Sequence, residues 1–204
     1  MTNDPRLLRR ALILVVVLNL GYFFIEATIA ILIGSVSLFA DSVDFLEDTA
    51  VNSLILLALG WPLARRAKIG KLMAVIICAP AVAALVMAII KFTDPEPPDF
   101  LSLLLTAGGA IVVNTICALV LARFRDAHGS LTTAAFLAAR NDVIANAAII
   151  AMAFVTLATR SGWPDIVLGL LIVALTLGAA KEVWEAATEE ELAAKALAGD
   201  FDDD

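Results

Sequence analysis

The sequence predicts an all-α integral membrane protein, a bundle of six transmembrane helices with both termini in the cytoplasm. Of its 204 residues, 61% are hydrophobic and only 17% are charged, and the mean hydropathy is +0.94. A soluble domain is about 45–50% apolar and about 25% charged, and a globule of this size cannot bury such an excess. An open sheet cannot satisfy its edges in hydrocarbon, so helices remain.

Six windows are long and apolar enough to cross a bilayer core, which needs about 20 residues per helix. They cover residues 11–33, 36–59, 72–90, 100–121, 131–157 and 165–180. The first window follows three arginines, as a secretory signal does, but it is too long and contains Asn19 and Glu26. We therefore expect it to remain as a helix.

The breaks between the windows have the composition of helix ends. They are Gly34-Ser35, Trp61-Pro62, the proline-rich stretch 94–99, the basic stretch 123–130, and 160–164. Glycine and proline in these positions interrupt helices, so each window ends where the hydrophobic run ends.

The basic residues predict the orientation. With a cytoplasmic amino terminus, only Lys91 and Arg160 lie outside. The basic residues placed inside are Arg6, Arg9, Arg10, Arg65, Arg66, Lys68, Lys71, Arg123, Arg125, Lys181 and Lys195. Cytoplasmic loops carry an excess of Lys and Arg, which favours this orientation.

We expect one six-helix transmembrane domain over residues 1–184 and an acidic cytoplasmic tail over 185–204. Nine of the 21 Asp and Glu follow Lys181, so the net charge of −7 belongs to the tail. The tail is too short to fold alone and should extend the sixth helix briefly before it frays at Gly199. No basic groove is apparent, so nucleic acid is excluded as a partner. Cys78 and Cys117 lie in apolar stretches, where core packing is their expected role.

The second window contains four acids that need a reason to be in a membrane. They are Asp41, Asp44, Glu47 and Asp48. Each costs about 2.5–3.5 kcal/mol at the bilayer centre, so they persist only if protonated, paired, solvated or bound to a cation. At about 100° per residue, Asp41, Asp44 and Asp48 share one helix face with Asn52, whereas Glu47 points elsewhere.

The fifth window supplies polar partners, which are Arg140, Asn141, Asp142 and Asn146. It runs antiparallel to the second window, and at about 1.5 Å per residue Asp142 falls near the midplane together with Asp44 and Asp48. These three aspartates are predicted to form an oxygen-lined cation site. Asn141 and Asp41 are candidate additional ligands, and the i, i+4 spacing of Asp44 and Asp48 lets both reach one ion.

Other acids have alternative interpretations. Glu47 and Arg140 are expected to form a structural ion pair, although one arginine cannot balance five carboxylates. Asp41 suits helix packing or ion entry as well as it suits ligation. For Glu26 a role in a proton relay and a structural hydrogen bond are equal alternatives. His128 is expected on the cytoplasmic surface, with a metal contact in the vestibule as the alternative.

The string GSVSLFADSVDFLEDTAVN, after a first helix that contains LNLGYFFIEATIA, resembles the cation diffusion facilitator (cation efflux) family of metal/proton antiporters. The resemblance covers roughly residues 11–184. It implies that Asp44 and Asp48 on the second helix, with Asp142 on the fifth, bind a divalent ion at the midplane. It also implies a tetrahedral site for zinc or a similar ion, and a homodimer.

The chain departs from that pattern in two places. Ala138 stands four residues before Asp142, where the family usually has His or Asp, so Asn141, Asn146, Asn52 or water would replace a ligand. Without a membrane histidine the site is harder than a usual zinc site, which makes Mn²⁺, Fe²⁺ or Co²⁺ alternatives to Zn²⁺. The cytoplasmic ferredoxin-like domain that the family commonly adds is also absent, so a homodimer would form through membrane helices.

We therefore expect a transporter that exports a divalent metal ion, Zn²⁺ first, from the cytoplasm by proton antiport. Its expected location is a bacterial inner (plasma) membrane, and its partners are the lipid bilayer, metal ions, protons and a second copy. The alternative is a non-transporting membrane metal-binding or assembly protein with a degenerate site. An enzyme is not expected, because no nucleophile with a base, phosphate loop or zinc protease signature occurs.

Overall fold

The computed structural model describes residues 5–58, 61–124 and 130–198, with the side chains of 5, 58 and 130–136 left aside. The described residues form six helices and no strands, which confirms the predicted all-α class. The helices are α1 (Pro5–Ile33), α2 (Val36–Ala58), α3 (Leu63–Lys91), α4 (Phe100–Ala122), α5 (Ser130–Thr159) and α6 (Trp163–Ala198).

Three helices extend well beyond the predicted windows. α1 begins at Pro5, α3 begins at Leu63 and α6 continues to Ala198. Hydropathy detects only the part that crosses hydrocarbon, whereas the extensions carry charged residues. Two ion pairs join the extensions of α3 and α6, Arg66 with Glu190 and Lys71 with Glu191. The hydrogen bond from Lys71 holds the pKa of Glu191 below its usual range.

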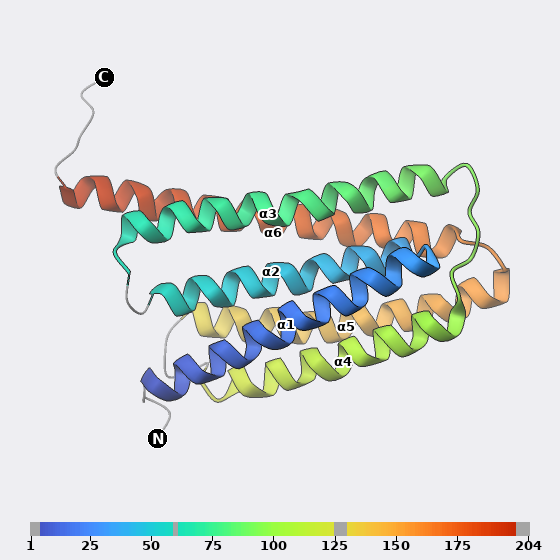
Figure 1. Ribbon diagram of the computed structural model, residues 1–204, viewed down its shortest axis with the longest axis horizontal. Coiled ribbons are helices and arrows are strands. Elements are labelled where there is room, and N and C mark those ends of the chain that lie inside the picture. Colours follow the sequence, from blue (N-terminus) through green and yellow to red (C-terminus); the bar gives the residue numbers. More distant parts are fainter. Residues whose placement is uncertain (1–4, 59–60, 125–129, 199–204) are drawn as a thin grey trace.

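The six helices lie side by side in a bundle (Figure 1). α3 and α6 pack along each other, as do α1 with α2 and α4 with α5. α2 packs against four helices, α1, α3, α5 and α6. With these four neighbours, the acidic helix α2 is the most enclosed of the six.

α1 begins and α6 ends at the same end of the bundle, which we call the termini end; the other is the opposite end.

The outer surface of the bundle is apolar. Long aliphatic side chains are exposed along the helices, Leu32 at 78% and Leu175 at 75% among them. In the described part of the chain, five helices are long and apolar enough to span a membrane. The sixth helix, α2, is as long as α4, with 23 residues, but it contains four acidic residues. Lipid is the medium that accepts such a surface, so the chain is an integral membrane protein.

Small residues let the helices approach closely. A Cβ atom on Gly70 would lie 2.8 Å from the Cβ of Ala187, where α3 meets α6. A Cβ atom on Gly109 would lie 2.3 Å from the hydroxyl of Tyr22, which donates a hydrogen bond to the carbonyl of Thr106. Such contacts hold helices together in lipid, where apolar burial gives little driving force.

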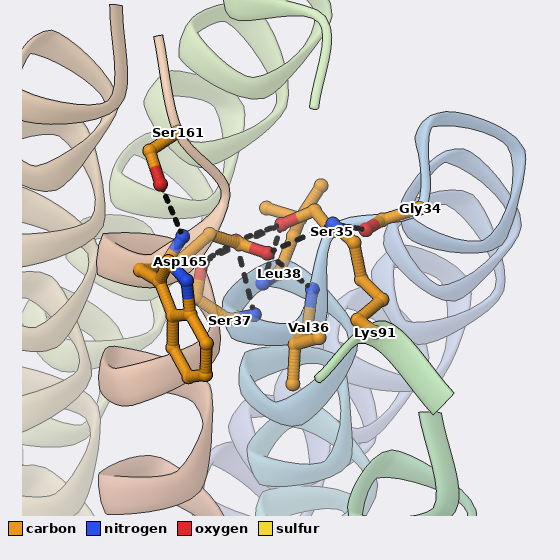
Figure 2. Close-up of polar contacts among 9 residues, drawn as sticks. Gly34, Ser35, Val36, Ser37, Leu38, Lys91, Ser161 and Asp165 are labelled. Atoms are coloured by element: carbon orange, nitrogen blue, oxygen red, sulfur yellow. Dashed lines mark hydrogen bonds and ion pairs between the residues drawn. The ribbon is translucent and has the colours of Figure 1, made fainter. Parts of the chain in front are cut away.

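A buried aspartate at the start of α6 connects it to the start of α2 at the opposite end (Figure 2). Asp165 is 1% exposed. It accepts hydrogen bonds from the hydroxyls of Ser35 and Ser37 at 2.6 and 2.7 Å, and from the N–H groups of Val36 and Ser37 at 2.8 and 3.2 Å. The carboxylate of one helix thus caps the amino end of another, where free N–H groups and the helix dipole favour a negative charge.

Three further residues complete this contact, which we call the Asp165 clamp. Lys91, at the end of α3, lies 3.6 Å from the Asp165 carboxylate and also donates to the carbonyl of Gly34. Gly34 has φ of +67°, a conformation that favours glycine and allows the tight turn between α1 and α2. Gly169 permits the approach, since a Cβ there would lie 2.6 Å from a Val36 methyl. The clamp joins α2, α3 and α6.

Replacing Asp165 with alanine should destabilise the protein by about 3 kcal/mol, because it removes the acceptor of two N–H groups and two hydroxyls and the carboxylate that is paired with Lys91. Thermal or denaturant unfolding in detergent measures the loss. Asp99→Ala is the control, since the exposed Asp99 caps α4 through one hydrogen bond from the Ser102 N–H. Equal losses from the two substitutions would show that the clamp contributes no more than an ordinary cap.

Candidate metal centre

The four acids of α2 lie inside the bundle. Asp41 and Asp48 are buried, and Asp44 and Glu47 are partly buried. Asn52, on the same face as the first three aspartates, is fully buried. This follows from the position of α2, which has neighbouring helices on four sides and so keeps its charged face out of lipid.

One hydrogen bond sets the register between α2 and α5. The amide of Asn146 donates to the carboxylate of Asp41 at 3.2 Å, so these residues lie at one level. The helices are antiparallel, and one turn toward the termini end leads from Asn146 to Asp142 on α5 and from Asp41 to Phe45 on α2. Asp142 is therefore level with the stretch between Asp44 and Asp48. It is close enough to both for their charges to interact.

Each aspartate of α2 receives a hydrogen bond from a different helix. Asn19 of α1 donates to Asp48 at 3.1 Å, and Thr176 of α6 donates to Asp44 at 2.6 Å. Asn146 of α5 does the same for Asp41. Each contact engages one oxygen of its carboxylate. Thr176 and the role of Asn19 were not predicted from the sequence, although a polar residue inside an apolar window is a signal of such a contact.

Cys117 extends this polar network into α4. Its thiol donates to the side-chain oxygen of Asn19 at 3.4 Å, and Asn19 in turn donates to Asp48. The thiol is fully buried. Cys117 thus has a polar partner beside the acids in addition to the apolar packing expected of it.

A cavity of about 320 Å³ runs from the acids toward the termini end. Glu47, Asp48 and Ala138 line its inner part, while Arg66 and Glu190 line the part near the start of α3. Ala138 lies one turn from Asp142 and faces the same space as Asp48. The position at which the resemblance leads us to expect a further ligand is therefore directed into this cavity.

Arg140 and Asn141 lie away from the group of acids. Both side chains are exposed, and Arg140 donates a hydrogen bond to Asn141 at 3.3 Å. Among the described residues, Arg140 makes no ion pair with Glu47, which instead lines the cavity. The helical rotation of about 100° per residue explains this, because a helix that directs Ala138 and Asp142 inward turns Arg140 to the other side. His128 lies outside the described residues.

Several buried oxygens in this region have no hydrogen-bond donor among the described residues. They belong to Glu26, Asp41, Asn52 and Asn146. Glu26 is fully buried and lies close enough to Asp41 and Asp44 for their charges to interact. Oxygens without donors are the groups that a cation or a proton satisfies. Within the described ranges, no three His, Cys, Asp or Glu side chains already stand in a metal-binding arrangement.

Most of the chain matches a known protein family. The family model of the cation efflux transmembrane domain matches residues 12–189. The search of curated proteins finds no match. The matched range begins in α1, ends in α6 and includes Glu26, the four acids of α2 and Asp142. The chain belongs to the cation efflux family, whose members are membrane transporters of metal cations.

Proposed function

We propose that this chain exports a divalent cation, Zn²⁺ first, from the cytoplasm in exchange for protons, and that Asp44, Asp48 and Asp142 bind the ion. The observation that carries the proposal is the Asn146–Asp41 hydrogen bond, because it brings Asp142 level with the two acids of α2. Three carboxylates from two facing helices would give a dication both its charge balance and its ligands.

The hydrogen bonds around the acids support this role. Asn19 and Thr176 each bind one oxygen of their aspartate, which fixes the side chain while the second oxygen remains for an ion. Asp41 is a further candidate ligand, since one of its oxygens has no donor among the described residues. Binding requires the side chains to turn toward a common centre. An all-oxygen set also admits Mn²⁺, Fe²⁺ or Co²⁺.

The route to the site agrees with export. The cavity leads from Asp48 toward the termini end, while the Asp165 clamp joins three helices at the opposite end. The termini end carries Arg9, Arg10 and Arg65, and by the positive-inside rule these basic residues favour a cytoplasmic location for it. The ion would therefore enter the site from the cytoplasm in this conformation.

Protons would compete with the metal ion for the same carboxylates. An empty, fully charged site is costly within the membrane, so the protein should change conformation readily only when loaded with metal or with protons. Glu26 would take part as a proton carrier, because it is buried beside Asp41 and has no donor in the described part of the chain. Exchange of metal for protons follows from this exclusion.

Inside-out vesicles with an acidic lumen should accumulate zinc or manganese as protons leave, because export from the cytoplasm corresponds to uptake into this lumen. A metal-sensitive dye and a pH dye in the lumen measure both fluxes. Asp48→Ala and Asp142→Ala should each abolish the two fluxes, since each removes an oxygen ligand from a site already short of one.

Glu189→Gln is the matched control, because it removes an exposed acid of α6 that lies far from the site along the helix. It should transport like the parent. Metal uptake that ignores the proton gradient would contradict antiport. If the parent binds metal but moves none, the chain is a membrane metal-binding or assembly protein instead.

Ala138→His should raise the affinity for zinc, and more than the affinity for manganese. Ala138 faces the cavity with Asp48, so an imidazole there adds the softer ligand that zinc favours. Calorimetry of the purified protein measures both affinities. Leu137→His is the matched control, because Leu137 is exposed and does not line the cavity. Equal gains from the two variants would show that position 138 does not reach the ion.

A further inference from the structure

We propose that a groove between α1 and α4 at the termini end binds an anionic phospholipid. The groove has a volume of about 370 Å³ and is lined by Arg10 of α1 and Arg123 at the end of α4. Apolar side chains of both helices, including Leu14 and Val120, form its walls. A ligand that fits this arrangement has a negative headgroup and an apolar chain.

The two arginines have their charge available. Both side chains are exposed, and within the described residues neither makes a hydrogen bond or an ion pair. Arg10 lies in the second turn of α1, and Arg123 is the residue that follows the last turn of α4. A phosphate between two guanidinium groups accepts charge-assisted hydrogen bonds from both, which gives it a defined position.

The apolar walls favour a lipid over a free anion. Leu14 is 46% exposed, and nearer the middle of the same two helices Val17 of α1 and Leu119 of α4 are exposed at 61% and 64%. An acyl chain can lie along this face while its headgroup remains at the helix ends. The arginines occupy the level at which basic residues meet the headgroups of a leaflet.

This site is separate from the candidate metal centre. Its residues lie near the ends of α1 and α4, whereas the acids lie midway along α2 and α5. The proposal therefore holds whether or not the chain transports metal. Its occupant is a phospholipid of the leaflet at the termini end.

Native mass spectrometry and thermal unfolding of the detergent-purified protein test the proposal. Phosphatidylglycerol should bind as a one-to-one adduct and raise the unfolding temperature, whereas phosphatidylcholine and inorganic phosphate should do neither. Replacing both Arg10 and Arg123 with glutamine should weaken phosphatidylglycerol binding about tenfold or more, since it removes two charged donors. Leu14→Gln should weaken it through the acyl chain.

The control protein carries Arg9→Gln and Arg65→Gln, which remove the same charge from the same end but not from the groove. It should bind phosphatidylglycerol like the parent. An equal loss in the control would overturn the proposal in favour of general attraction to basic residues. If inorganic phosphate bound and raised the unfolding temperature as phosphatidylglycerol does, the groove would be a site for anions and not for a lipid. If phosphatidylcholine bound as well as phosphatidylglycerol, the negative charge of the headgroup would have no role, which would also contradict the proposal.

Discussion

The structure depends on one constraint, that the acidic face of α2 cannot lie against lipid. α2 contacts α1, α3, α5 and α6, so the helices around it carry the lipid-facing surface in its place. The same enclosure lets α1, α5 and α6 each contribute a hydrogen-bond donor to a different aspartate. The charges that make α2 the least typical span are thus enclosed by its neighbours, and polar side chains of three other helices contact them along the middle of α2.

α6 connects the candidate site to both ends of the molecule. It contributes Asp165 to the clamp at the opposite end, Thr176 to the carboxylate of Asp44, and Glu190 to the ion pair that lines the cavity. Any movement of α6 relative to α2 changes the first two of these contacts together. α6 therefore connects the candidate site to both ends of the bundle through direct contacts.

The sequence predicted the fold class and the level of the acids because both follow from simple regularities. Hydrophobic length locates a span, and a helical rise of about 1.5 Å per residue places Asp142 beside the acids of α2. It did not predict the Asp165 clamp or the contact of Thr176, since these depend on which helices are neighbours. Arg140 and Asn141 were expected near the acids, but both side chains are exposed on the surface of the bundle. Neighbouring residues of a helix point in different directions, so closeness to Asp142 along α5 does not place a side chain beside the acids. A homodimer stays a prediction.

The central claim is that Asp48 and Asp142 bind the same ion. It is tested most directly by the zinc affinities of the parent, Asp48→Ala, Asp142→Ala and the double variant, measured by calorimetry. If both aspartates hold one ion, the double variant should lose little more than either single variant, with a coupling energy of at least about 1 kcal/mol. Losses that add would mean that the two aspartates act independently, and they would contradict a shared site between α2 and α5.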